Sequence, residues 1–311
     1  MNSKINVVLA SDDNYAQHMG LVILSCLTKA SQPERLSFFI LSNNISEKNK
    51  NNIKNISQQF SASSLIIEPP TDIYNNIPKK RYGVANLFRL SIGTLLPASV
   101  HKVIYLDCDV LFYADIKDLW ETELDDCTVG AVTNLGHQPV DRLGIEDGAY
   151  FNTGVLLINL DKWRKAQIGS QALEYMNNNI NKLIFPDQDG LNVSLKDNWK
   201  QLPLRWNQQP AVYSMFSKKH FEKSLSYQDY YDAIHNPAIV HFLANNKPWH
   251  YLTYHPLKES YYDYISKSPW SDYRPVDYTF LNILRKWFSV EKNIKRLYRR
   301  SIIPARFKTL A

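Results

Sequence analysis

VIYLDCDVLF, Val103 to Phe112, sets two carboxylates inside a run of apolar residues. The apolar residues, several of them β-branched or aromatic, predict a strand buried on both faces, with Asp107 and Asp109 at its acidic end. Two unpaired carboxylates at the edge of a core are unfavourable, and a divalent cation would offset their charge. Oxygen ligands favour magnesium or manganese, which keep positions open for phosphate oxygens. Asp-x-Asp is also common in ordinary turns, so a plain turn is the competing interpretation.

The residues before this run predict apolar strands that alternate with helices. The expected strands are 5–10, 36–42 and 64–68. Ser46 is placed to cap the helix between the second and third of them. Such alternation predicts an α/β class with a mostly parallel sheet, and ligands of these sheets bind at the carboxyl ends of the strands. The loop from Ser11 to Tyr15 and the loop after Leu106 should therefore meet at one edge.

Composition limits the class of protein. The chain has 311 residues, 44% of them apolar, which is enough for a large core. Its ten glycines form neither a G-x-G-x-x-G nor a G-x-x-x-x-G-K-[ST] motif, so both glycine-rich phosphate cradles are excluded. Three cysteines without metal or redox spacing, no membrane-spanning run and no signal-peptide pattern predict a cytoplasmic protein.

Several polar residues near the expected edge are candidates for binding a nucleotide. Asp12 and Asn14 follow the first strand and could bind a base and ribose, although Asp12 would serve equally as a turn or helix cap. Arg89 belongs to a predicted helix over 84–95. Its guanidinium would either steady a diphosphate or pair with a carboxylate of the site.

Two further segments combine polar side chains with helix or strand signals. In FNTGVLLINL, 151–160, Asn152 stands with Thr153 and Gly154 just before a buried strand, where it could meet polar substrate atoms. In FPDQDGLN, 185–192, Asp187, Gln188 and Asp189 follow a proline at a predicted helix start. Helix capping accounts for one acidic residue there but not for three polar ones, which favours a site.

AIVHFLANNKPWH, 238–250, contributes a histidine and a lysine. His241 shares a strand face with apolar residues, so it is either a core residue or a third metal ligand. Lys247 precedes Pro248 and Trp249, which would stiffen its loop. Its ammonium could neutralise a phosphate as a leaving group departs.

The acidic pair, FNTGVLLINL, PDQD and HFLANNKPWH, in this order, resemble a retaining glycosyltransferase of family 8, most of all the bacterial lipooligosaccharide α-galactosyltransferases. The likeness runs from Ile5 to about His250. It implies a GT-A fold: one nucleotide-binding α/β domain with a mixed sheet, here 1–260, and a small C-terminal extension, 261–311. It also implies transfer of galactose or glucose from UDP-galactose or UDP-glucose to a glycan acceptor on a lipid.

The resemblance assigns roles to individual positions. Manganese, or magnesium in its place, would be held by Asp107, Asp109 and His241. The uridine and diphosphate would lie near Ala10, Asp12, Asn14, Arg89 and Lys247, and the donor sugar near Asn152, Asp187 and Gln188, with Asp189 close behind. Whether Gln188 supports an oxocarbenium-like state or Asp189 forms a covalent adduct is left open. The family loop reads His-x-x-Gly-x-x-Lys-Pro-Trp, and Ala244 stands here in the glycine position.

Two other classes of protein compete with this interpretation. Haloacid-dehalogenase phosphatases also place Asp-x-Asp after an apolar run, but their motif begins the chain and is followed by Thr. A catalytically silent sugar-binding protein is the non-enzyme alternative. Release of UDP from UDP-sugars with and without manganese would separate the three.

The C-terminal segment is strongly basic. From Leu281 onward, nine basic residues stand against Glu291 alone, so this segment carries +8 and the first 280 residues carry −2 of the net +6. Its apolar and basic residues alternate at helical spacing, which predicts a helix on an anionic membrane surface at the inner face of the plasma membrane. Packing of the apolar stripe on the catalytic domain and non-specific nucleic-acid binding are the alternatives; no specific nucleic acid is expected. The apolar residues are Leu284, Trp287, Phe288, Ile294, Leu297 and Tyr298.

Overall fold

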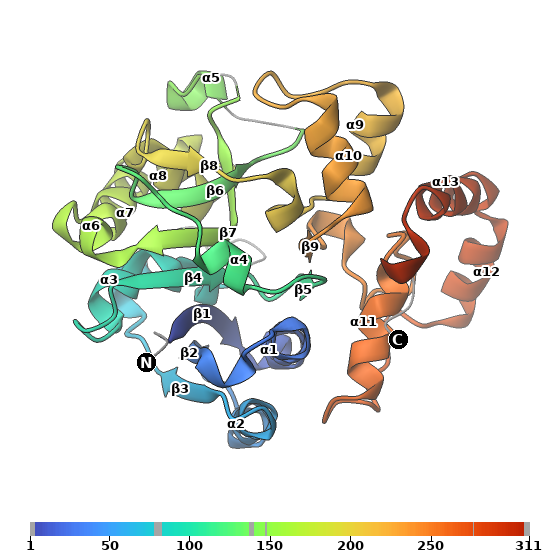
Figure 1. The fold of residues 1–311 in the computed structure, drawn as a ribbon, viewed down its shortest axis with the longest axis horizontal. Helices are drawn as coiled ribbons and strands as arrows, with labels where there is room; N and C mark the ends of the chain where they lie inside the picture. The colour runs from blue at the N-terminus through green and yellow to red at the C-terminus, as the bar shows by residue number, and fades with distance from the viewer. Residues whose placement is uncertain (1–3, 78–82, 137–139, 147, 276, 308–311) are drawn as a thin grey trace.

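A computed structural model of the chain describes residues 4–77, 83–136, 140–146, 148–275 and 277–307. A seven-stranded sheet in the order β3-β2-β1-β4-β7-β6-β8 forms its centre (Figure 1). The strands of this sheet are β1 (Ile5–Asp12), β2 (Leu36–Asn43), β3 (Ser63–Ile67), β4 (Lys102–Leu106), β6 (Val129–Thr133), β7 (Phe151–Asn159) and β8 (Trp199–Gln201). Most neighbouring pairs are parallel, and only β7 runs antiparallel to its neighbours. The predicted α/β class and mostly parallel sheet are confirmed.

The sheet separates two apolar cores, and β1 contributes to both. Val7 and Leu9 belong to the core under α1 and α2, whereas Val8 and Ala10 belong to the core under α6, α7 and α8. Alternate residues of a strand point to opposite faces, so a strand buried on both sides must be apolar throughout. The α-helices are α1 (Ala16–Lys29), α2 (Glu47–Gln59), α3 (Ile92–Leu95), α4 (Lys117–Trp120), α5 (Val140–Leu143), α6 (Leu160–Lys165), α7 (Ile168–Asn178), α8 (Pro186–Ser194), α9 (Ala211–Lys218), α10 (Tyr227–His235), α11 (Lys258–Ser266), α12 (Phe280–Phe288) and α13 (Val290–Ser301).

Helix starts follow the predicted signals in two places. The Ser46 side chain accepts a hydrogen bond from the backbone N–H of Asn49 and caps α2. Pro186 occupies the first turn of α8, where its missing N–H is no loss. The helix predicted over 84–95 differs: residues Ala85–Ser91 form a 3-10 helix, and only Ile92–Leu95 are α-helical.

The run over 103–112 forms two strands rather than one. β4 ends at Leu106, and Val110–Phe112 form β5, which pairs antiparallel with β9 (Ile239–His241) in a separate two-stranded sheet. Asp107 to Asp109 lie at the junction, where the chain leaves one sheet for the other. Because Val110 pairs with His241, the acidic junction lies beside the histidine.

The antiparallel strand β7 completes this edge. Its first residues pair toward the end of β4, with Leu106 opposite Val155, so Asn152 to Gly154 reach the edge where β1 and β4 finish. The backbone N–H of Asp107 donates to the carbonyl of Gly154 at 2.8 Å. A parallel strand in this position would bring its C-terminal end, rather than its N-terminal end, to the site.

The tail helices, α12 and α13, lie beside α11, on the side of the molecule opposite α6 and α7 (Figure 1). The helical prediction for this segment is confirmed, as two helices. Within the described residues, no helix is long and apolar enough to cross a bilayer.

Candidate functional site

The predicted residues converge on one cavity of about 630 Å³, here the main cavity, at the carboxyl ends of β1 and β4. This volume is typical of small-molecule sites. His241 and Asp189 do not line the cavity and lie behind its wall. The candidate residues that line it are Ala10, Asp12, Asn14, Arg89, Asp107, Asp109, Asn152, Asp187, Gln188 and Lys247.

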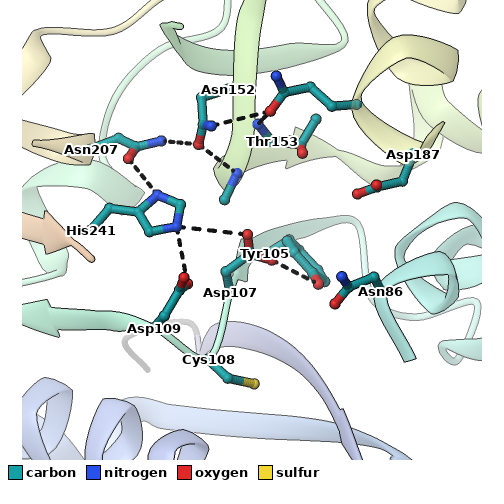
Figure 2. Close-up of polar contacts among 12 residues, drawn as sticks. Asn86, Tyr105, Asp107, Cys108, Asp109, Asn152, Thr153, Asp187, Asn207 and His241 are labelled. Carbon is teal, nitrogen blue, oxygen red and sulfur yellow. Dashed lines mark hydrogen bonds and ion pairs between the residues drawn. The ribbon is translucent and has the colours of Figure 1, made fainter. Parts of the chain in front are cut away.

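Asp107, Asp109 and His241 offer ligand atoms that all lie within 4.8 Å of one another. The Nε2 atom of His241 is 3.0 Å from Asp109 Oδ1 and 3.9 Å from Asp107 Oδ2 (Figure 2). Burial lowers the pKa of His241 to about 4, so the ring is neutral near pH 7. Three ligands of this kind, two carboxylates and one imidazole, fit a divalent cation such as manganese.

Asn207 sets the orientation of the histidine ring. Its Oδ1 lies 2.9 Å from His241 Nδ1. Because an amide oxygen accepts hydrogen bonds, we assign the proton to Nδ1, which leaves the lone pair of Nε2 directed at the two carboxylates. Nε2 has no hydrogen-bond partner among the described residues, although it is fully buried. A buried lone pair facing two carboxylates is unfavourable unless a cation lies between them.

Gly154 leaves space for this centre. A Cβ atom there would lie 2.8 Å from His241 Nδ1 and 2.9 Å from Asp107 Oδ2, closer than real Cβ atoms approach their neighbours. Glycine at this position therefore provides the room that the histidine and the carboxylate need.

A buried network of side-chain amides links the histidine to Gln188. Asn207 Nδ2 donates to Asn152 Oδ1 at 2.8 Å, and Asn152 Nδ2 donates to Gln188 Oε1 at 3.1 Å. Gln188 Nε2 reaches Asn134 Oδ1 at 3.4 Å. These four residues, the amide network, are each less than a tenth exposed. Buried polar groups that satisfy one another in this way hold fixed orientations, so the Gln188 amide is positioned rather than free to rotate.

Arg89 pairs with carboxylates, which is one of the two roles predicted for it. Its guanidinium lies 2.7 Å from Asp107 Oδ1 and 3.2 Å from Asp187 Oδ2, and it is almost fully buried. It also donates to the backbone and hydroxyl oxygens of Thr153, both at 3.0 Å, and stacks on the Tyr105 ring. Burial raises the pKa of Asp187, and the charge of Arg89 opposes that rise.

Lys247 pairs with the other carboxylate of the junction. Its ammonium contacts Asp109 Oδ2, and both groups line the main cavity. Each aspartate of the Asp-x-Asp motif thus has a cationic partner, Arg89 for Asp107 and Lys247 for Asp109. Lys247 is the less buried of the two cations and lies on the loop after β9, so it can also reach a ligand in the cavity.

Asp12 fulfils the capping role considered for it. Its side chain accepts from the backbone N–H of Tyr15 at 3.2 Å and caps a short 3-10 helix, Asp13–Tyr15. Asp12 and Asn14 nevertheless line the cavity, together with the Tyr15 ring. Tyr15 is half exposed and meets Trp249 edge to face, with 5.7 Å between ring centroids.

Asp189 is enclosed by hydrogen-bond donors. Its Oδ1 accepts from the Tyr150 hydroxyl at 2.7 Å. Its Oδ2 accepts from Arg142 at 2.8 Å and from the backbone N–H groups of Ile184 and Phe185 at 2.8 and 3.0 Å. The side chain has no exposed surface. A carboxylate held by four donors fixes the start of α8, next to Gln188, and is not directed into the main cavity.

Three residues of the site were not predicted from the sequence. Asn207 and Asn134 belong to the amide network, and Tyr15 lines the cavity. Tyr15 directly follows the candidate Asn14, so an aromatic residue at the end of that loop was an available signal. Asn134 directly follows the apolar run over 128–133, which gave a weaker signal. Asn207 stands in LPLRWNQQP, 202–210, a segment with no motif.

Comparison with known proteins gives consistent matches over most of the chain. A family model described as Glycosyl transferase family 8 matches residues 6–253. The general stress protein A of Bacillus subtilis is 33% identical over 273 residues, 86% of this chain and 95% of that protein. The lipopolysaccharide 1,2-glucosyltransferase of Escherichia coli strain K12 is 28% identical, over 88% of this chain and 81% of that protein. The crystal structure of the galactosyltransferase LgtC with donor and acceptor sugar analogs superposes with a TM-score of 0.77 at 27% identity, covering 85% and 96% of the two chains.

Proposed function

The chain belongs to glycosyl transferase family 8 and has its GT-A fold, and we propose that it moves galactose or glucose from a UDP-sugar to a terminal sugar of a lipopolysaccharide- or lipooligosaccharide-type acceptor. The observation that supports this most directly is the cluster of Asp107, Asp109 and His241 at the main cavity. Family membership sets aside the phosphatase interpretation of the Asp-x-Asp motif. Relatives that act on lipopolysaccharide support the choice of acceptor.

The proposal divides the main cavity among parts of the donor. Asp12 and Asn14, with Tyr15, would bind the uridine end. A cation held by Asp107, Asp109 and His241 would bind the diphosphate together with Lys247. Asn152, Asp187 and Gln188 would surround the sugar. The residues of the first group lie at the end of β1 or just after it. Those of the second come from the junction after β4, from β9 and from the loop after it, and those of the third from β7 and the start of α8.

The chemistry proposed for the site is stabilisation of a leaving diphosphate. Asp107, Asp109 and His241 would hold manganese or magnesium, which acts as a Lewis acid on the diphosphate. Lys247 adds a second positive charge beside the same oxygens, so departure of UDP requires no protein acid. Arg89 holds Asp107 and Asp187 in place. The amide network would hold the Gln188 side-chain oxygen near the sugar, where its partial negative charge can support a cationic centre.

Hydrolysis of UDP-sugars tests the donor and the metal together. We expect UDP release from UDP-galactose or UDP-glucose with manganese, and loss of release after chelation. GDP-mannose serves as the control donor and should not be cleaved. Saturable UDP-sugar binding without UDP release would indicate the silent binding protein, and equal release from both nucleotides would contradict the UDP assignment.

The domain division and the membrane association are also part of the proposal. Residues 1–260 would form the catalytic domain and 261–311 the extension, with α11 across the boundary. The tail helices contact the rest of the chain through polar groups: Arg296 and Arg300 pair with Glu259, and Lys286 donates to the Tyr251 carbonyl at 2.8 Å. Their apolar residues point away from the protein, which contradicts the alternative that this stripe packs on the catalytic domain. The outward residues are Phe280, Leu281, Leu284, Trp287, Phe288, Val290, Ile294, Leu297 and Tyr298.

An outward apolar face among cations is the arrangement of an interfacial helix, and each cation near an anionic bilayer adds about 1 kcal/mol. We therefore place the protein at the inner face of the plasma membrane in this proposal. Removal of the tail would also disturb the fold, because Ile303 and Phe307, which follow α13, are buried in the core under α1 and α2. Point substitutions avoid this difficulty.

The double variant Trp287→Glu/Leu297→Glu should no longer sediment with phosphatidylglycerol liposomes, because both side chains are mostly exposed on the outward face. A matched variant, Leu65→Glu/Ile73→Glu, changes exposed apolar residues far from the tail and should sediment normally. UDP-sugar hydrolysis should be unchanged in both. Equal sedimentation of the two variants would show that the tail is not the anchor.

A further inference from the structure

A second cavity lies between the tail helices and the loop 245–254. It has a volume of about 590 Å³, close to that of the main cavity. We name it the tail groove. The residues that define it for the following argument are Asn246, Thr253, Tyr254, Arg285, Phe288 and Lys292. Its walls include residues after 277, so the groove exists only where the tail is docked.

The tail groove and the main cavity share one wall. Asn246 lines both, whereas Ala244 and Lys247 line the main cavity and Asn245 lines the groove. The Thr253 hydroxyl donates to the carbonyls of Asn245 at 3.2 Å and Lys247 at 2.6 Å. The segment between the cavities is thus tied down from the groove side. A molecule in the groove would lie one loop away from the proposed position of the donor diphosphate.

The lining of the groove is cationic without a neutralising acid. Arg285 and Lys292 contribute two positive charges, and no acidic residue of the described chain is part of the lining. The nearest acids lie outside this lining. Glu291 pairs with Lys295, although its charge also acts on Lys292, and Glu259 pairs with Arg296 and Arg300. Asp277 accepts from the backbone N–H groups of Tyr251 and Leu252. Lys292 is placed over the Tyr254 ring, 5.7 Å from its centroid. Such a lining favours an anion with apolar groups beside it.

Phe288 indicates where this anion would come from. Its side chain is 81% exposed, belongs to the outward apolar face and also lines the groove. If the apolar face enters a bilayer, the mouth of the groove lies at headgroup level, where phosphate groups are concentrated. A glycan attached to a lipid at that level would extend past the shared wall toward the main cavity.

We propose that the tail groove is a binding site for a phosphate ester at the membrane surface, carried by the acceptor or by a lipid beside it, with Arg285 and Lys292 as its cationic contacts. The inference rests on the proposed function for its biological setting. The binding itself is independent of catalysis, since neither residue lines the main cavity.

Two soluble probes distinguish the sources of the phosphate: glucose 1-phosphate, which has no lipid, and dihexanoylphosphatidylglycerol below its micellar concentration. Binding to the full-length protein is followed by calorimetry. The variant Arg285→Gln/Lys292→Gln should bind at least one probe about tenfold more weakly than the unaltered protein. Weaker binding of both probes would show that the site recognises the phosphate alone. Weaker binding of the lipid probe alone would show that it recognises a lipid headgroup.

The matched control is Lys267→Gln/Arg306→Gln, which removes the same charge from the C-terminal extension outside the groove and leaves the pair of Glu291 with Lys295 intact. It should change the affinity less than twofold. Equal weakening in both variants, or no weakening in either, would overturn the site and leave only a diffuse basic surface. UDP-sugar hydrolysis should be unchanged in both variants; its absence in the unaltered protein would refute the proposed function without affecting the groove.

Discussion

The cluster of Asp107, Asp109 and His241 and the tail helices distribute polar and apolar groups in opposite ways. Around His241, charged and amide side chains are buried and apolar residues surround them. In the tail, charged side chains such as Arg296 turn toward the protein, and Trp287 and Leu297 turn toward solvent. Each arrangement is unfavourable in isolation, because buried charges lose hydration and exposed apolar groups order water. In the proposed function, a divalent cation offsets the first arrangement and an apolar membrane phase offsets the second.

The largest effect is expected from substitution of a carboxylate that is proposed to hold the cation. Asp109→Asn removes a charge that faces both His241 Nε2 and Lys247. A bound metal stabilises the leaving diphosphate by several kcal/mol, so UDP-sugar hydrolysis should fall on the order of a hundredfold or more. The control Asp125→Asn changes an exposed carboxylate that pairs with Lys200 and should have no effect on turnover. Near-normal hydrolysis by Asp109→Asn would show that this cluster does not hold a metal needed for turnover.

The next largest effect concerns a buried carboxylate that already has all its partners. In Asp189→Asn, an amide N–H would point at the donors of Arg142, Ile184 or Tyr150. Breaking a buried charged pair costs about 3 kcal/mol or more, and the melting temperature should fall by roughly 6–12 °C. Thermal unfolding measures this directly. Lost turnover with an unchanged melting temperature would instead identify Asp189 as a reacting carboxylate.

Substitution of Asn207 should have a smaller effect, confined to the affinity for the metal. Asn207→Ala removes the acceptor that orients His241, and loss of such a partner weakens metal binding roughly 10–100-fold. Asn207→Asp keeps an oxygen toward His241 and should retain most of the affinity. Titration with manganese, followed by the paramagnetic resonance of the free ion, gives the affinity without an activity assay. Equal affinities in all three proteins would show that the ring is fixed by packing alone.

The sequence predicted these regions to different depths. The strands, the Asp-x-Asp motif and the helical tail were predicted because each depends on a local pattern of apolar and polar residues. The separation of β4 from β5 was not, because it depends on β9, about 130 residues further along the chain. Asn207 was missed for the same reason, since its role is defined by His241 and Asn152. The direction in which the apolar face of the tail points was not predicted. It depends on Glu259, outside the tail, which decides which side of α13 faces inward.

A substitution at Glu259 tests what holds the tail helices against the rest of the chain. Glu259→Gln removes the charge that pairs with Arg296 and Arg300, the latter at 2.7 Å. The side chain is partly exposed, so we expect a loss of about 1 kcal/mol or less in tail docking. Trypsin should then cleave within α13 several times faster than in the unaltered protein. Glu291→Gln is the control, because Glu291 pairs only within α13, and it should leave the cleavage rate unchanged.

The smallest effect is expected at Ala244, on the segment that separates the main cavity from the tail groove. Its φ is +52°, in the left-handed region that glycine adopts freely and other residues adopt at about 1–2 kcal/mol. Ala244→Gly would relieve that strain but add freedom to the unfolded chain worth roughly 0.4–1 kcal/mol, so a net gain of about 0.5–1 kcal/mol should remain. The melting temperature should rise by about 2 °C. Ala166→Gly, at φ −85°, has no strain to relieve and should lower it. If both substitutions lower the melting temperature, the backbone of Ala244 is not strained, and the methyl group at this family glycine position is stabilising through its contacts.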